Sequence, residues 1–364
     1  MAGGARIQRQ ENHGMGDVNE FVNNRTDMQK LLTIVVPVYK VEPYINKCLD
    51  SCLIYKTNEQ GEKVLDEEMM DQLEVIIVND GTPDRSAEMS REYVKRYPQT
   101  FRQIDKENGG HGSAWNVGLK EATGKYLRFL DSDDWLTNLD KLMENLVAID
   151  ADLVFTNMQR YYADRGCFVE EKIHDEYDVV KPLSVFDFMC NSQPNVFDFW
   201  YVTYKKRVLE LNADVFSEKT MYDDALLFVL PAIKAKTYVC FDYFLYNYFI
   251  GRAEQSVNQE KMPKNIIARY NQCIYMDQFW RKHKPQILDK NVEEGVLKNI
   301  SNSAWSIFND ALVLPYTTVK QMAHELNHIF LYRKIPSKNY KRYMNMPLLL
   351  FYCTNKIRFW LNRR

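Results

Sequence analysis

Two short runs of apolar, largely β-branched residues stand out in the first third of the chain, and each run ends at a polar turn. The first is LLTIVVPVY at 31–39, and the second is LEVIIVNDG at 73–81. Continuous apolar runs of this length are typical of strands that are buried on both faces of a parallel sheet. Apolar residues at helical spacing predict helices over 43–55, 84–97 and 114–121.

A third strand is predicted at KYLRFL, residues 125–130, so strands and helices alternate. This order predicts an α/β domain with a mostly parallel central sheet. Later strands are expected at ADLVFTNM, FWYVTYKK and TYVCFDYFLYNYF, with a helix from Asp224 that Pro231 interrupts. Residues 57–72 are polar and acidic, which predicts a loop or an insertion.

The pattern divides the chain into three parts. Residues 1–28 are polar and are expected to be a flexible lead-in. Residues 29–257 form the expected α/β domain, with a first half at 29–135 and a second half at 136–257. From residue 258 onward the pattern is helical, which predicts a helical C-terminal extension.

Composition narrows the class of protein. The 364 residues carry 47 Lys+Arg against 49 Asp+Glu, a net charge of −2, and 46% are hydrophobic. These values are typical of a globular protein and argue against a general nucleic-acid binder, which would be basic. No apolar run reaches 18 residues, and the N-terminus has no apolar segment typical of a secretory signal. Seven cysteines without zinc-site spacing predict buried thiols in a reducing compartment, so a cytoplasmic location is expected.

The end of the chain is basic. Residues 329–364 contain nine Lys+Arg and no Asp or Glu, together with the apolar stretches LLLFY and FWL. Basic charge mixed with Trp, Phe and Leu can bind an anionic membrane surface. A helix packed on the domain would explain the same composition. Both interpretations stay open. If the tail binds a membrane, we expect the protein to lie at the inner face of that membrane as a peripheral protein.

The acidic turn DSDD follows the third strand. On an extended backbone Asp131 and Asp133 point to the same side, so they can offer two carboxylates to one Mg²⁺ or Mn²⁺ ion. The turn is not an EF-hand, because Leu136 stands where that loop needs glycine. The alternative is a helix start capped by Asp133 or Asp134, although a cap needs only one aspartate.

Other candidate groups follow strand ends, where α/β sheets bind their ligands. Asp80 could accept a hydrogen bond from a base or ribose, or form a plain Asx turn. Tyr39 could stack on a nucleobase or belong to the core. The loop NGGHGS at 108–113 offers backbone N–H groups to a phosphate or a sugar. It matches neither the dinucleotide fingerprint nor the P-loop.

Two further sets of residues suggest chemistry. Asp223 and Asp224 precede an apolar helix, where they could cap it or one could act as a general base toward a hydroxyl. Residues 324–328 spell HELNH, which matches the H-E-x-x-H zinc pattern. Residues 329–364 supply no His, Asp or Glu as a third ligand, so we interpret this match as chance on a helix face.

Four segments in order resemble the family 2 glycosyltransferases, which have a GT-A fold. They are TIVVPVYKVEPYINKCLDS, VIIVNDGTPDRS, ENGGHGSAWNVGLKEATGKYLRFLDSDDWL and YDDALLFVLPAIKAKTYVCFDYFLYNYFIGRAEQSV, together spanning 33–257. The resemblance implies an inverting, divalent-metal-dependent transfer of a sugar from a nucleotide sugar, with a UDP-sugar expected. The implied acceptor is a hydroxyl of a glycan or lipid-linked molecule in cell-surface polysaccharide synthesis.

The resemblance also assigns roles to single residues. Tyr39 and Asp80 would contact the base, Asp133 would be the main ligand of Mn²⁺ or Mg²⁺, and Asp131 would support the metal or the ribose. Arg252 would lie near the diphosphate. The implied donor-binding set is Pro37, Tyr39, Asp80, Asn108, Gly109, Gly110, His111, Asp131, Ser132 and Arg252.

Asp224 matches the aspartate of the family's E-D pair and would be the catalytic base, with Asp223 beside it. Asp223 replaces the glutamate of that pair, Asn79 replaces the first aspartate of D-D-G, and Trp115 stands where many members have arginine. Two other functions remain as alternatives: a non-catalytic module that binds a nucleotide sugar or glycan, and a nucleotidyltransferase. The latter lacks support because KVEP, rather than a glycine-rich loop, follows the first strand.

Overall fold

A computed structural model describes most of the chain. The described residues are 29–173, 175–186, 199–211, 215–252, 262–330, 343 and 345–361. The predicted lead-in at 1–28 and the predicted boundary at 257 lie outside them, so the division of the chain into three parts stays a prediction.

The described residues contain a ten-stranded sheet and a separate two-stranded hairpin. The sheet strands are β1 (Leu32–Val38), β4 (Leu73–Asn79), β5 (Phe101–Asp105), β6 (Tyr126–Phe129), β7 (Trp135–Leu136), β8 (Leu153–Tyr162), β9 (Cys167–Glu171), β10 (Lys181–Pro182), β11 (Val202–Lys205) and β12 (Thr237–Ile250). The hairpin strands are β2 (Tyr55–Thr57) and β3 (Lys63–Leu65).

Helices surround the sheet. The α-helices are α1 (Ile45–Asp50), α2 (Glu67–Gln72), α3 (Ser86–Arg96), α4 (His111–Glu121), α5 (Leu139–Ala148), α6 (Leu230–Lys234), α7 (Met262–His283), α8 (Lys290–Ala311), α9 (Tyr316–Phe330) and α11 (Leu348–Leu361). Short 3₁₀ helices are η2 (Leu183–Val185), η3 (Lys206–Val208) and η4 (Asp223–Phe228).

The first half of the sheet is parallel, in the order β5-β4-β1-β6. All residues of β1 and β4 are buried, because helices cover both faces, and this explains their unbroken apolar runs. Parallel strands need crossover helices, and α3 and α4 serve as these connections. Since β1, β4 and β6 run in the same direction, their carboxyl ends meet at one edge of the sheet.

The second half of the sheet joins the first through β11, which pairs antiparallel with both β6 and β8. Beyond it, β8 and β12 run parallel over ten residue pairs, with register shifts between Phe241 and Tyr246. The mixed sheet confirms the expected α/β class with a mostly parallel central sheet and a helical C-terminal region.

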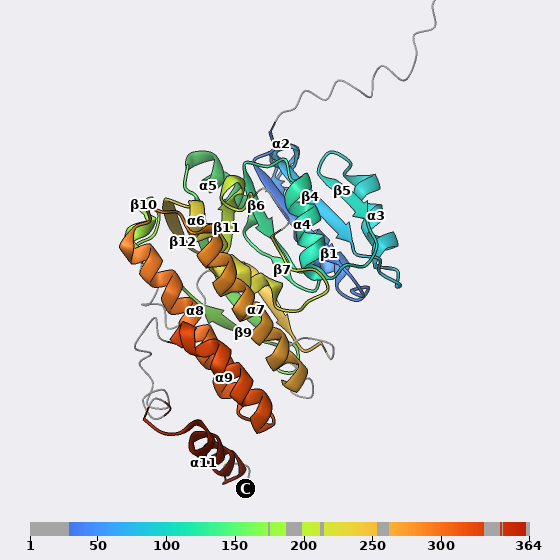
Figure 1. Ribbon diagram of the computed structural model, residues 1–364. Coiled ribbons are helices and arrows are strands. Elements are labelled where there is room, and N and C mark those ends of the chain that lie inside the picture. The colour runs from blue at the N-terminus through green and yellow to red at the C-terminus, as the bar shows by residue number, and fades with distance from the viewer. Residues whose placement is uncertain are drawn as a thin grey trace, which may run out of the picture.

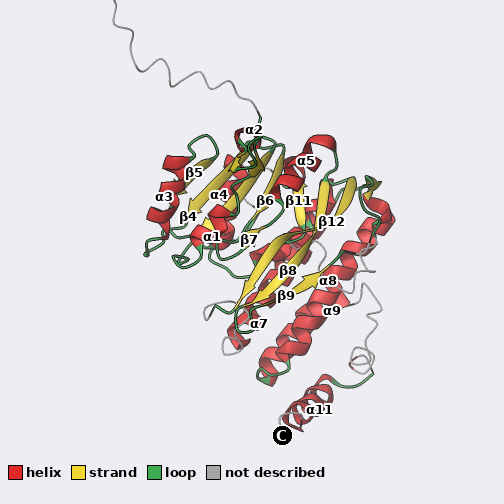
Figure 2. Ribbon diagram, turned by 180° about the vertical axis from the view of Figure 1, so that it is seen from behind, coloured by secondary structure: helices red, strands yellow, loops and turns green. Residues whose placement is uncertain are grey.

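The C-terminal helices α7, α8 and α9 pack side by side on the second half of the sheet (Figures 1 and 2). Helix α11 lies beyond α9, at the end of the molecule away from α2 (Figure 1). No helix within the described residues is both long enough and apolar enough to cross a membrane. Seven of the nine Lys and Arg residues of the basic tail lie outside the described residues, so its membrane role stays a prediction.

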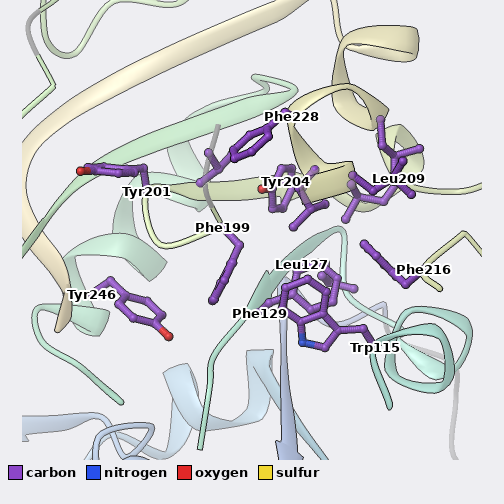
Figure 3. Close-up of a cluster of buried hydrophobic side chains, with 14 of the residues drawn as sticks. Trp115, Leu127, Phe129, Phe199, Tyr201, Tyr204, Leu209, Phe216, Phe228 and Tyr246 are labelled. Carbon is purple, nitrogen blue, oxygen red and sulfur yellow. The ribbon is translucent and has the colours of Figure 1, made fainter. Parts of the chain in front are cut away.

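An aromatic cluster joins the two halves (Figure 3). Trp115 on α4 is fully buried and stacks on Phe129 of β6, with ring centroids 4.1 Å apart. Phe199 and Phe216 meet its edges at 5.0 and 5.1 Å. Pairs of this kind stabilise beyond their buried area. The residue that replaces the family's arginine is therefore part of the core.

Several local predictions were wrong. The stretch 57–72 was predicted as a loop or an insertion, and the loop is wrong, because the β2–β3 hairpin and α2 fall within it or overlap it. The insertion stays a prediction. No helix begins after the DSDD turn, where the short strand β7 pairs with β12, so neither aspartate caps a helix there. The helix expected over 43–55 is the shorter α1, and β5 was not predicted. Cys167 and Cys353 are exposed, in contrast to the buried thiols of Cys48, Cys52, Cys240 and Cys273.

Candidate active site

A small cavity lies at the edge where the parallel strands end. It has a volume of about 350 Å³ and is lined by side chains from the ends of β1, β4 and β6 and from the start of α4. Of the ten predicted donor-binding residues, only Gly109 does not line it. The lining residues are Pro37, Val38, Tyr39, Val41, Asp80, Asn108, Gly110, His111, Ala114, Asp131, Ser132, Asp133 and Arg252.

Three aspartates of the DSDD turn bring carboxylate oxygens together. One oxygen each from Asp131, Asp133 and Asp134 lies within 4.8 Å of the others, and among the described residues no other such group of three potential metal ligands occurs. Burial, followed by the nearby charge of Asp131, raises the pKa of Asp133. Arg252 donates to Asp133 Oδ2 at 3.1 Å and so balances part of this negative charge.

Asp134 differs from its two neighbours. Its Oδ2 accepts a hydrogen bond from the Tyr246 hydroxyl at 2.5 Å, and its Oδ1 accepts one from the Phe249 N–H at 2.7 Å. The Tyr246 hydroxyl also accepts the Asp131 N–H at 3.2 Å. Both Asp134 oxygens thus serve to tie the turn to β12, which leaves Asp131 and Asp133 as the pair that faces the cavity. Two hard oxygen donors beside a cavity suit Mg²⁺ or Mn²⁺.

Asp80 holds the glycine-rich loop. Its carboxylate accepts N–H bonds from Gly109 at 2.9 Å and Gly110 at 2.8 Å, and an ammonium bond from Lys106 at 2.7 Å. Gly110 has a φ of +88°, a conformation that glycine adopts without strain. Asp80 therefore fixes the loop that starts α4, and a contact with a base stays a prediction. Tyr39, which is 41% exposed, offers its ring to the cavity.

His111 links the two acidic groups. Its Nε2 lies 3.0 Å from Asp131 Oδ1, and its Nδ1 lies 3.0 Å from Asp223 Oδ2. Burial alone would lower the pKa of His111, but the charge of Asp223 and the hydrogen bond and charge of Asp131 raise it well above its usual value. A protonated ring can donate from both nitrogens, one to each carboxylate. Its ring also packs on Trp115, with centroids 4.3 Å apart.

Asp223 and Asp224 begin η4 and have different surroundings. Asp223 is 2% exposed and is held by His111, whereas Asp224 is only partly buried. Burial, with the charge of Asp223 as the next cause, raises the pKa of Asp224 to about 7. Space is tight behind Asp223, because a Cβ on Gly112 would lie 2.8 Å from its Oδ2. A carboxylate with a pKa near neutrality suits proton transfer.

A second, larger cavity of about 670 Å³ adjoins the first, and His111 and Asp131 line both. Asp223 and Asp224 line this cavity, together with aromatic side chains from the segment before β11, from η4 and from β12. Its far wall comes from α7 and α8, through residues such as Gln272 and Asn302. Of the predicted metal pair and base, Asp133 therefore lines only the smaller cavity, Asp224 lines only the larger one, and Asp131 lies in the wall that the two cavities share.

The HELNH match has no role in this site. His328 Nε2 lies 3.1 Å from Asp277 Oδ2, and Glu325 bonds to Tyr270 and Gln321. Its residues are on α9, and the described residues place no third ligand with them. The roles that the sequence did not reveal are those of Lys106, Asp134 and Tyr246. The charge of Lys106 next to the glycine-rich loop was a usable signal, but nothing local points to Tyr246.

Comparison with known proteins agrees with this arrangement. The model of the family described as "Glycosyl transferase family 2" matches residues 33–203. The glycosyltransferase EpsJ of Bacillus subtilis is 31% identical over 212 residues, which are 57% of this chain and 57% of EpsJ. GlyA of Streptococcus pneumoniae is 31% identical over 187 residues, 49% of this chain and 25% of GlyA. The teichoic acid poly(glycerol phosphate) polymerase of Staphylococcus epidermidis is 38% identical over 108 residues, 29% of this chain and 13% of that protein.

The family model covers the first three of the four ordered segments and so confirms the resemblance to family 2 over residues 33–203. The chain spans a little over half the length of EpsJ and a quarter of GlyA. Among solved structures, S. aureus TarS 1–349 in complex with UDP-GlcNAc aligns with a TM-score of 0.58 and 17% identity, over 82% of this chain and 80% of TarS 1–349. This likeness confirms the GT-A fold.

Proposed function

We propose that this protein transfers a sugar from a nucleotide sugar to a hydroxyl of a glycan or lipid-linked acceptor in cell-surface polysaccharide synthesis. The proposed donor is a UDP-sugar. The observation that carries the proposal is the pair of cavities that meet at His111 and Asp131. The smaller cavity offers groups for a nucleotide diphosphate, and the larger one offers a carboxylate for an acceptor hydroxyl.

In the smaller cavity, Tyr39 provides a partly exposed ring for the base. The N-terminus of α4, which Asp80 holds in position through Gly109 and Gly110, borders this cavity at Gly110 and His111, and the first N–H groups of a helix have no partner within the helix. Helix N-termini favour phosphate through these unpaired N–H groups. Arg252 adds a cation at the same wall. This combination supports a nucleoside diphosphate sugar as the donor.

Asp131 and Asp133 are the residues that would hold Mn²⁺ or Mg²⁺. These two residues suit a divalent cation because their carboxylates lie close together in a partly buried turn. The charge of Asp131 contributes to the raised pKa of Asp133, and a cation between the two would relieve this repulsion. A bound divalent ion would neutralise charge on the departing nucleotide diphosphate. Asp134 takes no part, because β12 already occupies both of its oxygens.

Asp224 is the proposed base. It lines the larger cavity, and its pKa of about 7 allows it to accept a proton from an attacking hydroxyl at neutral pH. Asp223 holds His111 in place rather than contacting the acceptor. Because acceptor and diphosphate would occupy different cavities on either side of the sugar, a single displacement with inversion of configuration is the expected reaction.

The test is donor turnover with UDP-, GDP- and dTDP-sugars, with and without Mn²⁺ or Mg²⁺. Wild type is compared with Asp133→Ala and with Asp164→Ala, whose carboxylate is exposed on a turn away from both cavities. We expect metal-dependent nucleotide release that Asp133→Ala loses and Asp164→Ala keeps. Absence of both release and metal-dependent nucleotide binding would refute the proposal, and binding without any release would favour a non-catalytic module.

A further inference from the structure

The larger cavity contains polar groups that the proposed chemistry does not use. Asn302 and Ser303 on α8 line it, and their side chains have no hydrogen-bond partner within the described part of the chain. Gln272 on α7 also lines it and is held in place by donating to the Thr220 hydroxyl at 2.8 Å. Amides and hydroxyls that face a cavity are suited to hydrogen bonds with a polar, uncharged ligand.

Aromatic side chains also line this cavity. Trp200 and Tyr248 stack on each other with ring centroids 4.7 Å apart, and the Arg160 guanidinium lies 5.4 and 5.6 Å from these centroids, so the pair can meet a ligand only with the ring surface left uncovered. Tyr201 and Phe228 line the same cavity. Apolar ring faces that combine with a few polar groups are typical of sites for small ligands. A pyranose ring has this same character, with C–H groups on its faces and hydroxyls around its edge.

The cationic groups of this cavity, Arg160, Arg269 and His111, already pair with carboxylates. Glu171 pairs with Arg160 through both of its oxygens, and the Tyr201 hydroxyl donates to it at 2.6 Å. Arg269 Nη1 lies 2.7 Å from Asp310 Oδ2. A phosphate in the cavity would therefore find these arginines paired and would face the carboxylate of Asp224. Like charges brought together in a cavity disfavour binding.

We propose that the larger cavity is an acceptor site completed by α7 and α8, and that it takes an uncharged pyranose ring rather than a phosphorylated one. Asn302 and Ser303 bind ring hydroxyls, and the Trp200–Tyr248 pair packs on the ring. The C-terminal helices thus determine acceptor specificity. This inference rests on the proposed function, because it assigns the second substrate of that reaction.

The experiment uses the full chain and separates donor chemistry from acceptor binding. Donor hydrolysis and donor affinity are measured without acceptor, and transfer is then measured to neutral aryl glycosides and to the same glycosides carrying a 6-phosphate. We expect kcat/KM for the phosphorylated acceptor to be at least about tenfold lower. We expect Asn302→Ala to raise the acceptor KM by about threefold to tenfold, the effect of one lost hydrogen bond.

The matched control is Asn309→Ala, on the same helix, whose amide donates to the Trp305 carbonyl and does not line the cavity. It should leave the acceptor KM unchanged, and both variants should keep wild-type donor hydrolysis. Ser303→Arg places an unpaired cation in the cavity and should reverse part of the discrimination against the phosphorylated acceptor.

Three results would overturn the inference while leaving the proposed function intact. They are a preference for the phosphorylated acceptor, an unchanged acceptor KM in Asn302→Ala, and donor hydrolysis without transfer to any neutral glycoside. Loss of donor hydrolysis in wild type itself would instead refute the proposed function.

Discussion

The two cavities of this protein are built in different ways. Apart from Arg252, all residues of the smaller cavity come from residues 37–133, and most of them follow the ends of parallel strands or begin the next helix. The larger cavity takes residues from a range of nearly 200, from His111 to Ile307, and from sheet, 3₁₀ helix and C-terminal helices alike. Local sequence can therefore encode the first cavity, whereas only the complete fold assembles the second.

The two cavities share a wall that contains His111 and Asp131. His111 bonds to Asp131 of the proposed metal pair and to Asp223 beside the proposed base, although Asp223 is 112 residues away from it in the chain. Trp115 packs beneath the His111 ring and joins it to the aromatic core between the two halves. The chemistry expected of the family thus lies at a contact between distant segments.

The largest expected effect separates the base from the donor site. Asp224→Asn should lower the turnover of transfer by about 10³-fold, because a general base contributes on the order of 10²–10⁴. Donor affinity should stay at the wild-type level, since Asp224 lines only the larger cavity. Steady-state transfer and calorimetric donor binding measure the two quantities. An equal loss of donor affinity would show that the two cavities are not functionally separate.

The next effect tests the smaller cavity. Asp133→Asn should lower metal-dependent donor turnover by about 10²-fold, comparable to the loss of one electrostatic contact to a transition state. The affinity for Mn²⁺, measured by calorimetry in the presence of nucleotide, should fall with it. The free energy of unfolding should change little, because the partner of Asp133 is the side chain of Arg252 at the cavity wall. Unchanged Mn²⁺ affinity would remove Asp133 from the metal site.

Asp134→Asn is expected to lower the stability of the protein and to leave its Mn²⁺ affinity nearly unchanged. The aspartate is 1% exposed and both its oxygens accept hydrogen bonds, so its replacement should lower the free energy of unfolding by about 2 kcal/mol. Urea unfolding measures this loss. Mn²⁺ affinity, measured on the folded protein, should change much less than in Asp133→Asn. A matching loss of Mn²⁺ affinity without a change in stability would make Asp134 a ligand.

The smallest effect concerns the opposite end of the parallel strands. Glu74 accepts bonds from the Thr33 hydroxyl at 2.6 Å, the Thr123 N–H at 2.8 Å and Arg102 at 3.0 Å. Burial alone would raise its pKa, but these hydrogen bonds and the charge of Arg102 lower it. We expect Glu74→Gln to lower the free energy of unfolding at pH 7 by about 1 kcal/mol.

The sign of the pH dependence follows from the lowered pKa of Glu74. Its contribution is fully present above the pKa of an unfolded glutamate, about 4.3, and is lost as pH falls through the lower folded-state value. The stability difference between wild type and Glu74→Gln should therefore shrink in acid, as urea unfolding at pH 7 and at pH 3 would measure. A difference that grows in acid would contradict this assignment.

Much of the first cavity could be predicted from sequence, because strand ends bring together residues whose positions are set by short-range patterns. The apolar runs at 31–39 and 73–81 located β1 and β4, and the residues after them line the cavity. Asp134 could not be separated from Asp131 and Asp133 in this way. Its partner Tyr246 lies 112 residues later, and only the pairing of β7 with β12 brings it near.

Few features of the sequence predict the larger cavity. Asn302 and Ser303 occur in an amphipathic helix, where polar residues usually face solvent, so their sequence gives no indication of a cavity. The same holds for His111, whose place in a glycine-rich loop indicated donor contact but not the bridge to Asp223. Tertiary contacts decided these roles, and no local pattern encodes them.

Strand β12 limits where the chain can change in length. Side chains of a strand alternate between faces, so one added residue would turn every later side chain to the opposite face. Tyr246 bonds to the acidic turn, Tyr248 lines the larger cavity, and Arg252, just after the strand, contacts Asp133. The register shifts before Tyr246 determine to which face of the sheet these side chains point. An insertion between Tyr246 and Arg252 would therefore disrupt both cavities at once, whereas the exposed β2–β3 hairpin can lengthen without reaching either one.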